Sequence, residues 1–261
     1  AIKFKPDHAA SYNNKGSALK KIGQLKEAII AFEAAIFRNP TYADAYNNMG
    51  VALKDQGMRK EAIQAFHKAR NLQPDHAESL NNLGITLQEQ GRRENAVSFY
   101  KKALHFKPDF AEAYNNLGTA VKENDELQAA LEYYKKAVSI DPSYSEAHYN
   151  MGITFQAQGK LKYAIESYNK ALSINPMHSH SYNNLGIALR LFGKRTESLL
   201  NFNKAIKLNP GFSEAYNNIG NTLQGINKNK EAIDNYKKAV QLKPDYAEAY
   251  TNLGNTLNKF N

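Results

Sequence analysis

Residues 111–142 read AEAYNNLGTAVKENDELQAALEYYKKAVSIDP and contain two amphipathic stretches separated by a short break. The apolar side of the first stretch has a spacing of three, one and three residues: Tyr114, Leu117, Gly118, Val121. That spacing is typical of one face of a helix. A second periodic stretch covers residues 127–140, and Pro142 ends it because proline cannot continue a helix. The segment therefore predicts a pair of helices.

The same segment recurs along the whole chain with a period of 34 residues. Every proline of the chain keeps this interval: Pro6, Pro40, Pro74, Pro108, Pro142, Pro176, Pro210, Pro244. Eight glycines keep it as well: Gly16, Gly50, Gly84, Gly118, Gly152, Gly186, Gly220, Gly254. A fixed period indicates a repeat array. We begin the repeats at residues 9, 43, 77, 111, 145, 179 and 213, with the end of a second helix at residues 1–8 and a lone first helix at 247–261. We expect one array over residues 1–261.

Small residues and rings occupy fixed positions in each repeat. A ring marks the second helix: Phe32, Phe66, Tyr100, Tyr134, Tyr168, Phe202, Tyr236. Alanine or serine precedes it by four residues, and Leu-Gly recurs in the first helix, as in Leu117-Gly118. This pattern resembles the tetratricopeptide repeat (TPR) family over the whole chain. The resemblance implies an all-α fold, a right-handed α-solenoid superhelix of stacked antiparallel helix pairs with seven full repeats and partial repeats at both ends. It also implies that the first helix of each repeat lines a concave groove.

The helix ends have their own signals. Between the two helices of each repeat stands a residue type that tolerates positive φ, which predicts a left-handed C-cap: Gly23, Gly57, Gly91, Asp125, Gly159, Gly193, Asn227. A small polar residue after each of six prolines is expected to cap the next helix: Asp7, Thr41, Asp75, Asp109, Ser143, Asp245.

Two asparagine columns are the candidate binding residues. Position 6 of the repeat is asparagine throughout: Asn14, Asn48, Asn82, Asn116, Asn150, Asn184, Asn218, Asn252. Position 5 is asparagine in six repeats: Asn13, Asn47, Asn81, Asn115, Asn183, Asn217. A carboxamide can bond the N–H and C=O of an extended peptide together. The column is similar to the asparagine ladder in the TPR domain of O-linked N-acetylglucosamine transferases, which implies a polypeptide held along the groove. The alternatives are that these side chains bond neighbouring helices, or that they reflect recent duplication of the repeat.

Composition and charge exclude several classes of function. The chain has no cysteine, and no apolar run approaches the length of a membrane span. Its net charge of +9 comes largely from lysines expected on the outside of the second helices: Lys68, Lys101, Lys102, Lys135, Lys136, Lys170, Lys204, Lys237, Lys238. Seven arginines are few for nucleic-acid readout, so we do not expect nucleic acid as a partner. We find no phosphate loop, nucleophile motif or metal-ligand set, and expect no enzyme activity, metal or cofactor.

The termini suggest a fragment of a longer array, because the chain begins late in a second helix and ends after a first helix. Four residues of the last helix would normally be covered by a following one: Tyr250, Leu253, Leu257, Phe260. Terminal repeats need a polar outer face, so we expect end-to-end self-association there. The leading function is a scaffold that binds an extended polypeptide. The alternatives are the substrate-recruiting arm of a larger glycosyltransferase-type enzyme and a self-assembling structural module. The expected location is cytoplasmic.

Overall fold

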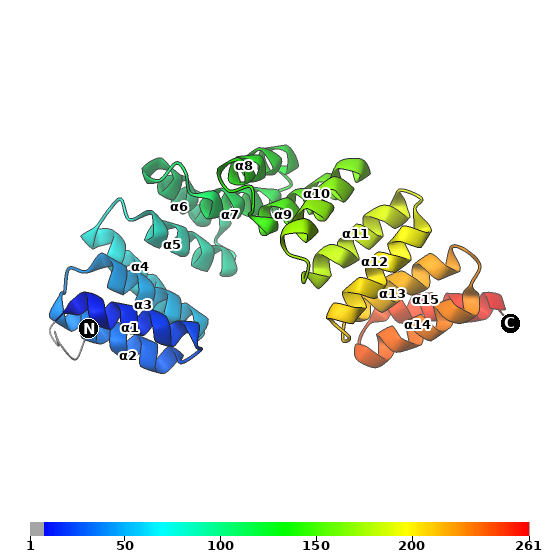
Figure 1. Ribbon diagram of the computed structural model, residues 1–261, viewed down its shortest axis with the longest axis horizontal. Coiled ribbons are helices and arrows are strands. Elements are labelled where there is room, and N and C mark those ends of the chain that lie inside the picture. The colour runs from blue at the N-terminus through cyan, green and yellow to red at the C-terminus, as the bar shows by residue number, and fades with distance from the viewer. Residues whose placement is uncertain (1–7, 261) are drawn as a thin grey trace. The chain divides into compact units, whose positions relative to one another are not determined.

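The computed structural model describes residues 8–260, and these residues form fifteen helices and no strand (Figure 1). The odd-numbered helices are the first helices of the repeats: α1 (Ala9–Lys21), α3 (Ala43–Asp55), α5 (Ala77–Glu89), α7 (Ala111–Lys122), α9 (Ser145–Ala157), α11 (Ser179–Leu191), α13 (Ser213–Gln224), α15 (Ala247–Phe260). The even-numbered helices are the second: α2 (Leu25–Arg38), α4 (Arg59–Leu72), α6 (Arg93–Phe106), α8 (Leu127–Ile140), α10 (Leu161–Ile174), α12 (Arg195–Leu208), α14 (Asn229–Leu242). The predicted repeat starts coincide with the odd-numbered helices, which confirms the all-α solenoid of helix pairs.

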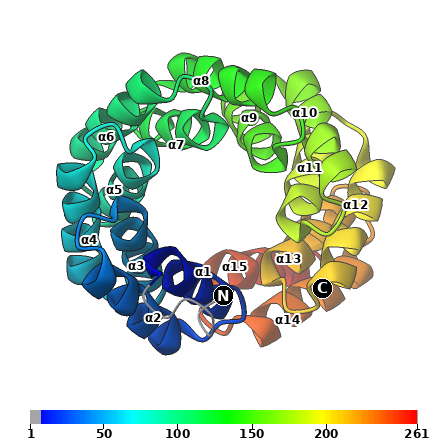
Figure 2. The ribbon, with the colours of Figure 1, turned by 60° about the vertical axis from the view of Figure 1, so that its left-hand side comes forward.

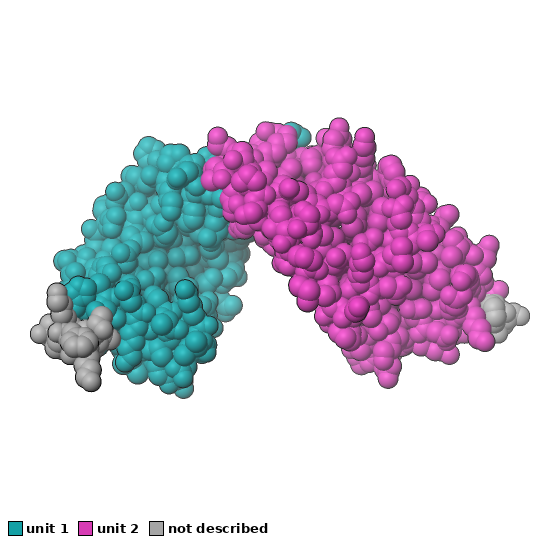
Figure 3. All heavy atoms as spheres, viewed as in Figure 1, with its two compact units in different colours: residues 1–129 teal, residues 130–261 magenta. Residues whose placement is uncertain are grey.

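The chain divides into two compact units, one ending at Ala129 and one beginning at Ala130 (Figure 3). Within each unit an odd-numbered helix packs against its even-numbered partner and also touches the next odd-numbered helix. Even-numbered helices of one unit make no such contact among the described residues. Each unit therefore curves with its odd-numbered layer on the inner side, where α1, α3 and α5 lie together (Figure 2). A single domain over residues 1–261 stays a prediction, and the helix end expected at residues 1–8 lies, except for His8, outside the described residues.

The core of each repeat is a ring laid against a glycine. A methyl group built on Gly84 would stand 2.4 Å from Cε1 of Tyr100, and one on Gly220 would stand equally close to Tyr236. The ring at this position is buried in every repeat, and so is the alanine or serine four residues before it. The absence of a side chain on the odd-numbered helix is thus what lets the even-numbered helix approach, which explains why the two residue types keep a common period.

The turn between the helices of a repeat has the predicted left-handed residue. All seven predicted residues have φ between 61° and 89°: Gly23, Gly57, Gly91, Asp125, Gly159, Gly193, Asn227. The backbone N–H groups of this residue and of the next one bond the last carbonyls of the odd-numbered helix: Gly91 N donates to Gln88 O and Arg92 N to Leu87 O, both at 2.9 Å. The C-cap prediction is confirmed.

The predicted N-caps are wrong by one residue. The residue before α3 is Tyr42, not Thr41, and His76 precedes α5 where Asp75 was expected. The remaining predictions, Asp109, Ser143 and Asp245, likewise fall one residue early, and Asp7 lies outside the described residues. The reason is visible at Asn39, whose Oδ1 accepts from Thr41 N at 3.1 Å. The polar residue belongs to this turn around the proline, and the helix starts only afterwards.

Candidate functional site

The two asparagine columns lie on the inner, odd-numbered layer and bond each other across the repeats. The position-6 Nδ2 donates to the position-5 Oδ1 of the preceding repeat. In the first unit these bonds are Asn48 to Asn13 at 3.0 Å, Asn82 to Asn47 at 3.0 Å and Asn116 to Asn81 at 3.1 Å. In the second unit they are Asn218 to Asn183 and Asn252 to Asn217, both at 3.0 Å. Within each unit, these bonds therefore join the inner helices of adjacent repeats, one pair of asparagines at each junction.

The two columns differ in exposure. The position-5 side chains lie behind the surface, with 1 to 7% of each residue exposed: Asn13, Asn47, Asn81, Asn115, Asn183, Asn217. Most position-6 residues stay partly exposed on the inner face: Asn48, Asn82, Asn116, Asn184, Asn218, Asn252. Asn14 is exposed, whereas Asn150 is buried at 7%. A ligand on this face would therefore touch position 6, with position 5 behind it.

Glutamates at position 2 of the following repeat accept hydrogen bonds from the Nδ2 groups of two buried position-5 asparagines. Asn81 Nδ2 donates to Glu112 Oε1 at 3.1 Å, and Asn217 Nδ2 donates to Glu248 Oε1 at 3.0 Å. With its Oδ1 accepting and its Nδ2 donating, each of these carboxamides has a fixed orientation. The Oδ1 of Asn82, by contrast, accepts no hydrogen bond from the described residues. Asn82 thus keeps an acceptor and one N–H for a ligand, whereas Oδ1 of Asn184 already accepts from Asn183 Nδ2 at 3.3 Å.

A ring interrupts the position-5 column in the second unit. Tyr149 stands where the other repeats have asparagine, and its hydroxyl accepts from Asn184 Nδ2 at 3.1 Å. The ring of His178 packs edge-on against it, with 4.9 Å between the centroids. Burial lowers the pKa of His178, an effect that the charge of Glu146 opposes and that of His180 adds to. Burial at this position thus favours the neutral form of the imidazole.

The structure also shows a row of rings at the helix N-termini that the sequence analysis did not predict. The residue before each odd-numbered helix from α3 onward is aromatic or histidine: Tyr42, His76, Phe110, Tyr144, His178, Phe212, Tyr246. Some of these rings reach the asparagine columns, as the Tyr246 hydroxyl does where it accepts from Asn217 Nδ2 at 3.3 Å. The sequence signal for this row is the aromatic or histidine residue two positions after each proline.

The charged groups follow the predicted division. The nine lysines expected on the outside of the even-numbered helices are all exposed: Lys68, Lys101, Lys102, Lys135, Lys136, Lys170, Lys204, Lys237, Lys238. At position 2, burial acts to raise the pKa of Glu78, but the Lys107 ammonium at 2.7 Å outweighs it, so the pKa is lowered.

The described residues contain no group of three histidines or carboxylates able to hold a metal ion. In the same part of the chain, no helix has the length and apolar character needed to cross a bilayer.

Family models identify these helix pairs. Models described as "Tetratricopeptide repeat" match residues 41–109, 145–178, 179–212 and 201–234, and a model described as "TPR repeat" matches residues 16–57, 122–159 and 226–259. The chain belongs to the tetratricopeptide repeat family. It is a protein–protein interaction scaffold, and its repeat-only composition is typical of non-catalytic scaffolds. No match is found among curated protein sequences.

Solved structures share the fold. A chain of the Cut9–Hcn1 hetero-tetramer of APC/C is 17% identical with a TM-score of 0.82, covering 98% of this chain and 50% of that one. YrrB, described as a TPR protein with an unusual peptide-binding site, is 24% identical with a TM-score of 0.60, covering 72% of this chain and 97% of its own. MamA is 32% identical with a TM-score of 0.55, covering 61% and 94%. This chain therefore spans half the length of the Cut9–Hcn1 chain.

Proposed function

We propose that the chain binds an extended or flexible polypeptide along its odd-numbered helices through the position-6 asparagines. The observation that carries the proposal is the pairing of Asn82 with Asn47, repeated from one repeat to the next. It fixes the carboxamide of position 6 and leaves its Oδ1 and second N–H on a partly exposed surface. These are the two groups that a peptide backbone can bond.

Such a column would read the backbone rather than side chains. Each hydrogen bond contributes only about 0.5–1.5 kcal/mol net, so useful affinity needs several in series. The regular interval of the repeat supplies such a series on each unit. We therefore expect affinity that rises with peptide length and depends little on the order of small side chains. The buried position-5 residues take the role of orienting groups, not of direct contacts.

A pair of matched double variants tests this role. Asn82→Ala with Asn218→Ala removes two position-6 side chains, whereas Asn47→Ala with Asn183→Ala removes the same two hydrogen bonds from their other ends. The probe is a fluorescein-labelled peptide of glycine, serine and alanine, long enough to span several repeats. We expect the position-6 double variant to bind it at least about tenfold more weakly, and the position-5 double variant to keep most of the affinity.

Stability serves as the control in this experiment. Each double variant leaves buried or half-buried amide groups without partners, so both should lose free energy of unfolding, by about 1–3 kcal/mol per site. Binding is measured well below both melting temperatures. Equal losses of affinity in the two double variants would mean that the asparagines only hold the helices together. The proposed binding of a peptide by the position-6 asparagines would then be wrong.

End-to-end self-association is a second proposal with its own observation. On α15, Tyr250 is 51% exposed and Leu257 is 36% exposed, while Leu253 is half-buried against the core around Tyr236. The side chain of Phe260 lies outside the described residues. Tyr250→Lys together with Leu257→Lys should abolish any concentration-dependent rise in mass in light scattering. A wild-type protein that stays monomeric at high concentration would rule this proposal out.

The remaining sequence-based alternatives have no structural observation in their favour. They are the arm of a larger glycosyltransferase-type enzyme, the likeness to the ladder of O-linked N-acetylglucosamine transferases, and a cytoplasmic location. All three stay predictions.

A further inference from the structure

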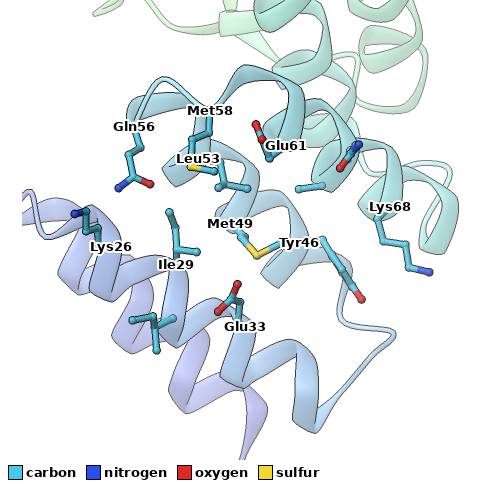
Figure 4. Close-up of a pocket in the computed structure, with 13 residues that line it drawn as sticks. Lys26, Ile29, Glu33, Tyr46, Met49, Leu53, Gln56, Met58, Glu61 and Lys68 are labelled. Carbon is cyan, nitrogen blue, oxygen red and sulfur yellow. The ribbon is translucent and has the colours of Figure 1, made fainter.

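An apolar cleft of about 760 Å³ lies on the other side of the first unit, between α2 and α4 (Figure 4). Its floor is formed by α3 through Tyr46, Met49 and Leu53, and Ile29 and Met58 stand over it. The cleft exists because neighbouring even-numbered helices do not touch, which leaves part of the core stripe of α3 open. It is separate from the asparagine columns, which occupy the inner face.

The lining of this cleft is larger and more apolar than that of the corresponding cleft in the second unit. The corresponding cleft between α10 and α12 has a volume of about 320 Å³. Where that cleft has Glu166, the first has Ile30, and where it has Lys194, the first has Met58. Ile30 is 64% exposed and Met58 is 39% exposed, so neither is needed in the core. Two of the four methionines of the chain, Met49 and Met58, line this one cleft. Flexible, polarizable methionine is typical of surfaces that accept a partner's apolar side chains.

The rims carry charges in a complementary order. Lys26 and Glu33 stand on α2, and Glu61 and Lys68 stand on α4 in the reverse order. Each pair is seven residues apart, which is two turns or about 10 Å along a helix. None of the four makes an ion pair with another described residue. The rims therefore suit an occupant with no net charge. On each flank it would carry one acidic and one basic side chain about two helical turns apart.

An occupant of this cleft must also satisfy its own backbone. An extended segment would lay N–H and C=O groups against Ile29, Met49 and Leu53, which offer no hydrogen bond. A helix satisfies these groups internally and presents side chains at i, i+4 and i+7 to a groove. We propose that the α2–α4 cleft docks one amphipathic helix of a partner protein, with large aliphatic anchors at that spacing and charges of both signs on its flanks.

Two labelled peptides test the proposal by fluorescence anisotropy on the whole chain. The first is an alanine-based helix of about 18 residues with leucines at i, i+4, i+7 and i+11 and flanking glutamate and lysine. The second has the same composition with the leucines distributed around the helix. We expect the first to bind at least about tenfold more tightly. Ile30→Glu with Met58→Lys, which places the residue types of the second cleft in the first, should remove that preference.

Leu200→Glu is the matched control, because Leu200 has the same place in its repeat as Ile30, is 59% exposed and lies outside the cleft. This variant should bind the first peptide as wild type does, as should the Asn82→Ala, Asn218→Ala double variant, so the result is independent of the asparagine ladder. The proposal fails if the two peptides bind alike, if Leu200→Glu loses as much affinity as the cleft variant, or if the cleft variant binds like wild type. It also fails if dodecanoate binds the cleft and the peptides do not, or if light scattering shows a dimer that the cleft variant abolishes.

Discussion

The imidazole of His76 lies with Nε2 2.9 Å from Oδ1 of Asp44 and joins the start of α5 to α3 of the preceding repeat. Its other nitrogen, Nδ1, accepts from the backbone N–H of Ser79 at 3.1 Å. Because Nδ1 must be the acceptor there, the proton is on Nε2, and the neutral ring donates to the carboxylate. One buried side chain thus caps a helix and links two repeats.

Replacing His76 should cost more than replacing its partner. His76→Ala loses the cap and the inter-repeat bond, and we expect a loss of about 1–2 kcal/mol in the free energy of unfolding. Asp44→Ala loses only a bond to a largely exposed carboxylate, so the expected loss is below about 1 kcal/mol. Denaturant unfolding of both variants measures the difference. Equal losses would show that the cap contributes nothing.

The contact between glycine and ring predicts opposite effects for two glycine substitutions. Gly220→Ala drives a methyl group to 2.4 Å from Tyr236, and we expect a loss of about 1–3 kcal/mol. Gly254→Ala meets nothing within 4 Å, so the better helix propensity of alanine should leave stability unchanged or raise it by up to about 1 kcal/mol. Thermal unfolding distinguishes the two. A similar loss at both positions would mean that the close approach is not what the glycine serves.

Ser198 offers a stabilising substitution. It is fully buried where the other repeats have alanine, and its hydroxyl has no hydrogen-bond partner among the described residues. Ser198→Ala removes an unpaired buried polar group, so we expect a gain of about 1 kcal/mol. The melting temperature should rise accordingly. A fall would indicate that the hydroxyl bonds an internal water.

The buried tyrosines should make the fold sensitive to alkali. Burial raises the pKa of Tyr236 from 10.0 to about 12. Between these values the unfolded chain has released the phenol proton and the folded chain has kept it, so stability is complete below pH 10 and falls as pH rises toward 12. Tyr236→Phe, which has the ring that Phe202 has in its own repeat, should make that fall less steep. Urea unfolding at pH 8, 10 and 11 measures the slope, and an unchanged slope would contradict the prediction.

The sequence predicted the helices because their ends are marked by residues with strong backbone preferences. Asp125 and Asn227 were recognised as left-handed caps on the same ground as the glycines, and both have positive φ. The N-cap predictions at Thr41 and Asp75 are wrong by one residue, and at Thr41 the reason is that its N–H and hydroxyl both donate to Asn39 in the turn around Pro40. The sequence shows the two asparagine columns, but it does not show whether their side chains bond each other. Asn82 and Asn47 are 35 residues apart, and whether they meet depends on the rotation between successive repeats, which no local pattern records.

Within each unit, every contact between described helices joins elements no more than two places apart along the chain. No long-range closure, such as a sheet or a barrel, has to be preserved when the number of repeats changes. A copying or deletion event that keeps the 34-residue reading period therefore creates one new joint between repeats and leaves the packing on either side intact. The number of repeats can therefore change in whole steps while the remaining joints are kept, as long as enough repeats are left to bury a continuous core.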